Sequence, residues 1–284
     1  MSKRSKAANV VQYVILSILT IISVFPFFWM IIATTNKSVD ITKGTLVPGT
    51  YLIENIKALL ASDLDFLGAF KNSLIIAVTT TVLAMIISSA AGYAFVVYKS
   101  KARERVFNII LLSMMVPFAA MMVPLFRMFS KFNSIPGLNL IGLNSYGSVV
   151  IIAVATAFLI FFFRQNTKTF PKELIEAARI DGLGEFRIFT RVYMPTMKSV
   201  YAAAIVVTFM TSWNNYLWPL IVTNSPSNRT LTVGLAIFAK SKEANMQWAN
   251  VCAATFIIIL PLLIAFFFLQ KQFMNSFVSA GIKE

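Results

Sequence analysis

The 284-residue sequence contains no histidine and a single cysteine, Cys252. The absence of histidine argues against a His-ligated metal site and against a Ser-His catalytic pair. One cysteine cannot form an intrachain disulfide, and a cysteine inside an apolar run is typical of a small buried hydrophobic residue. We therefore expect no catalytic residue, no metal site and no cofactor held by this chain.

Charged residues are also scarce. They make up 13% of the chain, whereas hydrophobic residues make up 58% and the mean hydropathy is +0.76. Soluble domains have about 25% charged and about 45–50% apolar residues, so the excess apolar surface predicts a membrane protein whose helices face lipid. The net charge of +14 then indicates basic cytoplasmic loops near anionic lipid rather than a nucleic-acid-binding surface.

Six apolar runs are long enough to cross about 30 Å of hydrocarbon as helices. They predict an all-α, polytopic protein in which residues 1–284 form one transmembrane domain. The first run is too long for a signal-peptide core and is expected to remain as a span. Pro117 and Pro124 interrupt the third run, so a kink or split is expected near one of them. The runs are approximately 10–33, 73–98, 106–130, 146–163, 199–223 and 250–270.

The basic residues predict that both termini are cytoplasmic, because most of them then fall on the cytoplasmic side. A long outer loop, about 34–72, carries a short amphipathic pattern that predicts an interfacial helix. A second outer loop, about 224–249, is polar. The long inner loop spans about 164–198. The basic segments assigned to the inside include Lys3, Arg4 and Lys6, then 99–105, 164–198, Lys271 and Lys283.

The apolar runs contain essentially no Asp, Glu, Lys or Arg, whereas proton- or sodium-coupled carriers commonly hold their ion with carboxylates at membrane depth. This favours an external energy source. The nearest approach to a phosphate-binding loop, Gly44 to Gly49, lacks the required lysine. ATP and Mg²⁺ are therefore expected on another subunit. An ion channel lacks support because there is no charge ring or filter motif, and an intramembrane enzyme lacks a nucleophile–base pair.

The inner loop predicts a helix of about three turns from Pro171 to Gly182. Leu174, Ala177 and Ala178 are expected to share one face of it. A second helical stretch, about 185–193, is expected to end at Pro195. Periodicity alone supports equally a helix lying on the membrane surface and a helix that docks on a partner.

Glu176-Ala177-Ala178, Gly182 and 192–195 together resemble the EAA signature of binding-protein-dependent ABC importer permeases, E-A-A-x3-G-x9-I-x-L-P. Val192 stands in place of the usual Ile, and Met194 in place of Leu. The Asp181-Gly182 pair and the stretch 213–220 resemble the carbohydrate-uptake branch, in which the six-span, MalG-like subunit of maltose-type transporters is the best match.

The resemblance implies a non-catalytic permease subunit in the bacterial plasma membrane that imports a sugar or oligosaccharide. Its implied partners are a second, MalF-like permease subunit, a cytoplasmic ATPase dimer and an extracellular solute-binding protein, which the loop 224–249 would contact. The alternatives are a homodimer, a solvated connector for that loop, and a non-sugar cargo such as a polyol phosphate. The residues implied in ATPase coupling are Glu176, Ala177, Ala178, Asp181, Gly182 and Pro195.

The fifth run contains polar and aromatic residues within an apolar stretch. Sugar sites combine aromatic faces with amide donors, so these residues are candidates for the substrate pathway. Alternatively, the aromatic residues form an interfacial belt and the amides bond between helices. The candidates are Trp213, Asn214, Asn215 and Trp218.

Overall fold

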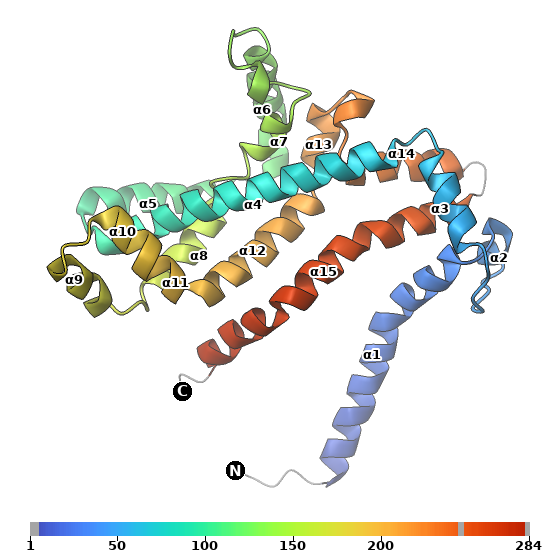
Figure 1. Cartoon of the computed structure of the whole chain (residues 1–284), viewed down its shortest axis with the longest axis horizontal. Helices are drawn as coiled ribbons and strands as arrows, with labels where there is room; N and C mark the ends of the chain where they lie inside the picture. The colour runs from blue at the N-terminus through green and yellow to red at the C-terminus, as the bar shows by residue number, and fades with distance from the viewer. Residues whose placement is uncertain (1–5, 244–246, 282–284) are drawn as a thin grey trace. The chain divides into compact units, whose positions relative to one another are not determined.

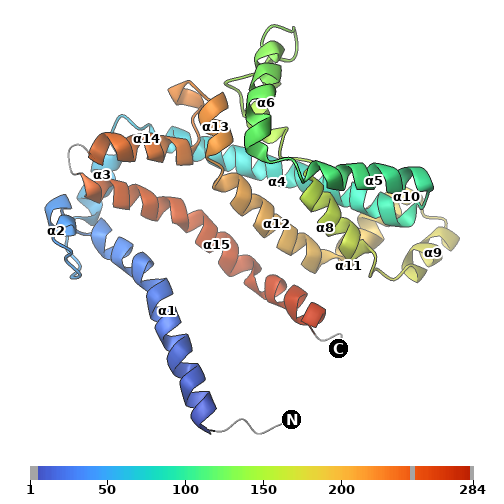
Figure 2. The same cartoon turned by 180° about the vertical axis from the view of Figure 1, so that it is seen from behind.

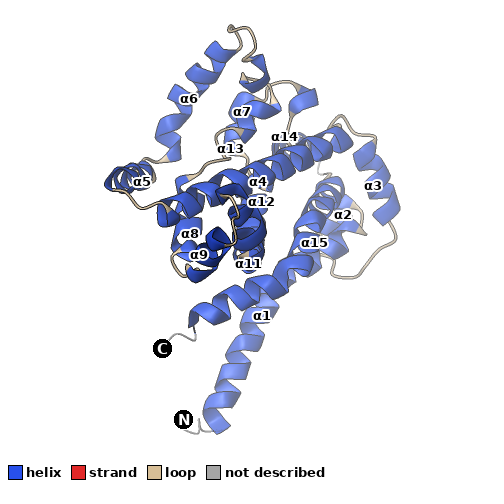
Figure 3. Ribbon diagram, turned by 60° about the vertical axis from the view of Figure 1, so that its left-hand side comes forward, coloured by secondary structure: helices blue, strands red, loops and turns tan. Residues whose placement is uncertain are grey.

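The computed structural model of the chain describes residues 6–243 and 247–281, and every regular element within those ranges is a helix (Figure 3). The all-α prediction is confirmed. The chain divides into two compact units: the described residues up to 66 with 235–260, and 67–234 with the described residues from 261. Lys3, Arg4 and Lys283, which were used to predict the orientation, lie outside the described residues.

Three helices are long and apolar enough to cross a membrane: α1 (Lys6–Thr34), α4 (Phe66–Val97) and α15 (Trp248–Gly281) (Figure 1). α4 begins seven residues before the predicted run 73–98, because hydropathy places the boundary at the polar residues near Lys71 although the backbone is already helical there.

The predicted third span is split at Pro117. α5 (Lys101–Ser113) and α6 (Phe118–Phe132) meet at an angle of 102°. Pro117 is the N-cap of α6, where its missing N–H is not needed, whereas Pro124 lies inside α6. The expected split is confirmed at the first of the two prolines.

The predicted fourth run, 146–163, is not one helix. It contains α7 (Tyr146–Val150), a turn, and then α8 (Ala157–Thr167). The Thr156 side chain accepts a hydrogen bond from the Leu159 N–H at 3.3 Å and so starts a new helix. Apolar composition does not reveal such a cap, which is why the run appears continuous in the sequence.

The predicted fifth run, 199–223, is also interrupted. α12 (Lys198–Trp213) ends where Asn214 and Asn215 begin, and α13 (Leu217–Val222) follows. Asparagine side chains compete for backbone hydrogen bonds, and Asn214 Nδ2 donates to the Met210 carbonyl at 2.9 Å. The segment Glu185–Thr196 joins α12 at a bend of 82°. Within the described residues there are thus three candidate spans, or five if each bent pair counts as one, and the six-span prediction is not confirmed.

The first unit also contains α2 (Ser38–Thr42) and α3 (Leu52–Leu60) in the predicted outer loop 34–72. α3 is the expected amphipathic helix. It is tied to the end of α1 because buried Asn55 donates from Nδ2 to the carbonyls of Thr34 and Asn36 at 2.8 and 3.0 Å. Cys252 is half-buried and packs against a small apolar core that includes Ala33 and Ala249, as predicted for a small hydrophobic residue.

The predicted outer loop 224–249 is not a plain connector. It holds the short helix η3 (Pro226–Asn228) and the thirteen-residue helix α14 (Leu231–Glu243), while residues 244–246 lie outside the described residues. Leu231 and Val233 are buried, and the Leu231 N–H donates to Ser73 Oγ of α4 at 2.7 Å. The sequence did not predict α14, because the turn residues before it make the whole segment read as a polar loop although 231–239 is mostly apolar.

The second unit contains α4 to α13 and two apolar cores. α8 packs against both α5 and α12, as seen from behind in Figure 2. η1 (Asn139–Ile141) and α13 pack with α7. Gly92 of α4 has no room for a side chain, because a Cβ there would lie 2.6 Å from the Phe163 Cβ of α8.

Candidate coupling site

The EAA residues lie on α9 (Glu173–Ile180), a helix of eight residues. It is shorter than the predicted three turns because Pro171 and Lys172 precede the helix rather than opening it. Figures 1 and 2 place α9 at the same end of α4 as the start of α5, with α13 toward the other end of α4.

The C-terminus of α9 is closed by Gly182, whose φ is +78°. The Leu183 N–H donates to the Ala178 carbonyl and the Gly182 N–H to the Arg179 carbonyl, both at 3.0 Å. This is the Schellman pattern, and it requires a left-handed residue at the position of Gly182. A Cβ at Gly182 would meet nothing within 4 Å in the described chain. The left-handed conformation, and not close approach within this chain, therefore explains the glycine.

α9 has two distinct faces. Ile175 and Ala178 are buried, with 3% and 7% exposure, in an apolar core that contains Phe163 of α8. Leu174 and Ala177 point away from this core and are exposed. The prediction that Leu174, Ala177 and Ala178 share one face is therefore wrong, because Ala178 joins the inner face at i+3 from Ile175.

The exposed surface of α9 combines carboxylates with apolar side chains. Ile180 is 87% exposed, and Glu176 and Asp181 are also exposed. Glu176 forms no ion pair with any side chain that the structure describes. It borders a cavity of about 240 Å³ together with Lys172 and Arg179. This face is thus suited to a partner that offers both a basic group and an apolar surface.

Arg179 at the end of α9 is held by a carboxylate from the next helix. Arg179 Nε lies 2.7 Å from Glu185 Oε1, and the Tyr98 hydroxyl donates to Glu185 Oε2. Burial, and then the hydrogen bond to Glu185, raises the pKa of Tyr98 to about 12. The hydrogen bond to Glu185 raises the pKa of Arg179 as well. Sequence reasoning missed Tyr98 and Glu185, because residues 87 positions apart give no local pattern.

The predicted second helical stretch exists but is irregular. It contains α10 (Glu185–Ile188), a π-helical turn η2 (Phe189–Tyr193) and α11 (Met194–Thr196). The Tyr193 hydroxyl is buried and lies 2.6 Å from Thr167 Oγ1. Pro195 is exposed within α11, immediately before the bend into α12, rather than ending the helix.

The four candidate pathway residues separate into two kinds. Trp213 and Trp218 are 2% and 0% exposed, and Trp218 Nε1 donates to the Ser148 carbonyl at 2.8 Å. Trp218 lies in an apolar core of the second unit and Trp213 stacks on Phe209, so neither forms an exposed belt. Asn214 is exposed, and the Asn215 carbonyl accepts a hydrogen bond from Thr232 Oγ1 at 2.8 Å.

Comparison with known proteins now identifies the family. Residues 83–277 match the profile of the binding-protein-dependent transport system inner membrane component. The chain belongs to this family. It is therefore a multi-pass, non-catalytic permease of a binding-protein-dependent ABC importer in the inner membrane. Importers of this kind work with an ATPase and a binding protein.

Individual relatives cover almost the whole permease. It is 43% identical to the lactose transport system permease protein LacG of Rhizobium radiobacter, over 98% of this chain and 97% of that protein. It is 34% identical to the arabinooligosaccharides transport system permease protein AraQ of Bacillus subtilis, over 93% and 92%. The sn-glycerol-3-phosphate transport system permease protein UgpE of Salmonella typhi is 32% identical, over 90% and 91%.

The fold also matches a solved structure. A chain of a bacterial ABC transporter involved in the import of the acidic polysaccharide alginate superposes with a TM-score of 0.82. The match covers 96% of the permease and 100% of that chain at 23% sequence identity.

Proposed function

We propose that α9 is the helix through which a separate cytoplasmic ATPase drives this permease. The observation that carries the proposal is the two-faced packing of α9. Its inner face, Ile175 and Ala178, is fixed in the core of the second unit, while its outer face presents Glu176 and Ile180 to solvent. When one face of a helix is close-packed in a core and the other face is free to bind a partner, movement of the partner displaces the helix and the core together. ATP and Mg²⁺ bind to the ATPase and not to this chain.

The proposal extends to topology and assembly. The permease crosses the membrane six times with both termini in the cytoplasm, counting each bent or broken pair of helices as one crossing. α1 is exposed along nearly all of its length, with 6% of its apolar window buried, which supports a role in contacting lipid and a second, MalF-like permease subunit. An extracellular solute-binding protein delivers the cargo.

The cargo is a sugar or an oligosaccharide. The support comes from the relatives named for lactose and arabinooligosaccharides, which are more similar to this chain than the relative named for glycerol phosphate. A polyol phosphate is the alternative cargo. Uptake of labelled lactose, arabinooligosaccharide and glycerol phosphate by the complete transporter separates these cases.

Asn214 and Asn215 are proposed to face the substrate, and Trp213 and Trp218 to hold the helix break between them. Asn214→Ala should then raise the KM for uptake with only a small fall in melting temperature, because its side chain is exposed and makes one hydrogen bond, to the Met210 carbonyl. Trp218→Phe should lower the melting temperature, because it removes a buried hydrogen bond. An Asn214 variant with unchanged uptake would remove this residue from the pathway.

Two isoleucines on opposite faces of α9 test the coupling role. Ile175→Ala leaves a cavity in the core and should cost roughly 2–4 kcal/mol of stability. Ile180→Ala changes an exposed side chain and should leave the melting temperature unchanged while weakening association with the ATPase. If Ile180→Ala changed neither association nor ATP-driven uptake, α9 would not be the docking helix.

Glu176 provides a second test of the same surface. Glu176→Gln preserves shape and removes the charge, so a pairing with a basic group on the ATPase predicts weaker association and slower uptake. Glu173→Gln is the matched control, because Glu173 is an exposed carboxylate on the same helix. Equal effects of the two substitutions would indicate a general charge effect, and no effect of Glu176→Gln or Glu176→Ala would refute the pairing.

A further inference from the structure

A basic cleft of about 550 Å³ lies beside the coupling loop in the second unit. It is formed where the end of α4, the start of α5 and the end of α8 meet, with Phe95 and Val96 in its wall. We propose that this basic cleft binds a phosphate group, and that an anionic phospholipid supplies it. The other polar and charged residues that line the cleft are Lys99, Ser100, Lys101, Glu104, Arg164, Lys168 and Lys172.

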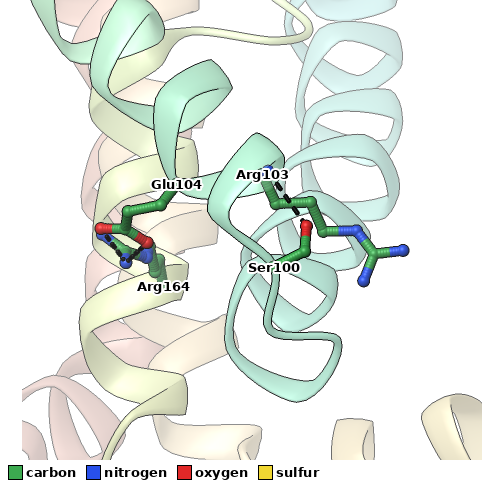
Figure 4. Close-up of polar contacts among 4 residues, drawn as sticks. All are labelled: Ser100, Arg103, Glu104 and Arg164. Carbon is green, nitrogen blue, oxygen red and sulfur yellow. Dashed lines mark hydrogen bonds and ion pairs between the residues drawn. The ribbon is translucent and has the colours of Figure 1, made fainter.

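The charge of the cleft is not neutralised from within. Its single carboxylate, Glu104, accepts hydrogen bonds from Arg164 Nη2 at 2.8 and 2.6 Å (Figure 4). The Arg164 guanidinium also lies 3.8 Å from the centre of the Phe107 ring, so it is held in place on both sides. The charges of Arg164 and Glu104 therefore cancel, and the positive charge that remains in the cleft comes from the lysines.

Four lysines converge on the cleft from two segments that are distant in sequence. Lys99 and Lys101 flank the start of α5, which is fixed because Ser100 Oγ accepts a hydrogen bond from the Arg103 N–H at 3.2 Å (Figure 4). Lys168 and Lys172 follow α8. None of the four forms an ion pair with a described side chain. A solvated basic loop has no need to gather its lysines in one concavity, whereas like charges gathered there attract an anion.

Apolar surface farther along α5 favours a lipid over a soluble phosphate ester. Leu112 lies eleven residues after Lys101, about three helical turns, and so on the same side of α5. Leu112 is 61% exposed and Ile109 is 66% exposed. A phospholipid whose headgroup lies in the cleft can place an acyl chain along this surface of α5, whereas a soluble phosphate uses the charges alone.

The test is retention of phosphatidylglycerol by the purified, complete transporter, measured by native mass spectrometry after exchange into phosphatidylcholine nanodiscs. The variant is the triple substitution Lys99→Gln, Lys101→Gln and Lys168→Gln. Each lysine near an anionic surface contributes about fivefold in affinity, so the triple variant should bind on the order of 100-fold more weakly. Lys172 stays unchanged because it borders α9.

Two controls separate a site from general charge or misfolding. Arginine at the same three positions keeps the charge and should keep the lipid. Glutamine at three exposed lysines that do not line the cleft, Lys43, Lys57 and Lys131, removes the same charge and should leave retention unchanged. Equal retention in all variants, or equal loss in both glutamine triples, would overturn the proposal.

A competition arm distinguishes the two sources of phosphate. Inorganic phosphate and glycerol phosphate at millimolar concentration should not displace the lipid. Displacement by either one would assign the cleft to a soluble phosphate and overturn the lipid assignment. The readout is lipid binding, so the outcome does not depend on whether α9 docks on the ATPase.

Discussion

Gly182 provides the sharpest test of how α9 is held. Its φ of +78° allows the two backbone hydrogen bonds, to Ala178 and Arg179, that close the helix. An L-residue in the left-handed region costs roughly 1–2 kcal/mol, asparagine less, and a β-branched residue more. Because a Cβ would meet nothing within 4 Å among the described residues, this conformational cost is the whole effect that they predict.

The conformational cost at position 182 predicts an order of coupling between ATP hydrolysis and uptake among the variants. Each 1.4 kcal/mol changes the ratio of closed to open helix ends about tenfold. ATP-driven uptake in proteoliposomes, divided by ATP hydrolysis, should therefore fall from glycine to asparagine to alanine to valine at position 182. Gly184→Ala is the matched control, since Gly184 also has open space around it but a φ of −70°. It should remain fully coupled.

The decisive comparison is between Gly182→Asn and Gly182→Ala. Asparagine is the larger side chain, yet it tolerates the left-handed conformation better. If the asparagine variant were the less coupled of the two, the defect would follow side-chain volume. Gly182 would then be needed for close approach of the ATPase, and the conformational explanation would be refuted.

Two further predictions concern the packing of α4, α5 and α8, and both are checked by the melting temperature in detergent. Gly92→Ala should lower the free energy of unfolding by about 3 kcal/mol, because its Cβ would lie 2.6 Å from the Phe163 Cβ and 2.8 Å from the Arg164 backbone nitrogen. An unchanged melting temperature would mean that α4 and α8 separate easily. Glu104→Gln should lower the free energy of unfolding by roughly 3 kcal/mol, because the Arg164 side chain is only 10% exposed and loses its counter-charge. Arg164→Met should lower it by only about 1 kcal/mol, because the carboxylate that it leaves unpaired is 54% exposed. The opposite order would contradict this account of their burial.

The sequence predicts the helical fold well because hydrophobic excess and proline are local signals. The split at Pro117 and the left-handed Gly182 both follow from the chemistry of one residue. The sequence did not predict the helix breaks at residues 151–156 and 214–216. Hydropathy averages over a window, so a cap such as Thr156 inside an apolar run leaves no trace in it.

The site was predictable only in part, for a related reason. The EAA pattern locates α9, and Gly182 marks its end. The orientation of α9 follows from the core behind it, which is assembled from distant segments, so periodicity placed Ala178 on the wrong face. The bond between Tyr98 and Glu185 likewise joins two segments that become neighbours only in the folded chain.

That same core explains how movement of α9 would reach the membrane-spanning helices. The Tyr193 ring packs against Tyr93 of α4 with 4.8 Å between centroids, and Phe163 of α8 packs against Tyr201 of α12 at 5.0 Å. All four residues belong to the core that holds Ile175. Close-packed interiors do not deform continuously, so a push on α9 must move the adjacent ends of α4, α8 and α12 together. α12 ends at Trp213, outside this core. We therefore expect helices to move relative to one another at breaks of this kind, and not within the loop that carries α9.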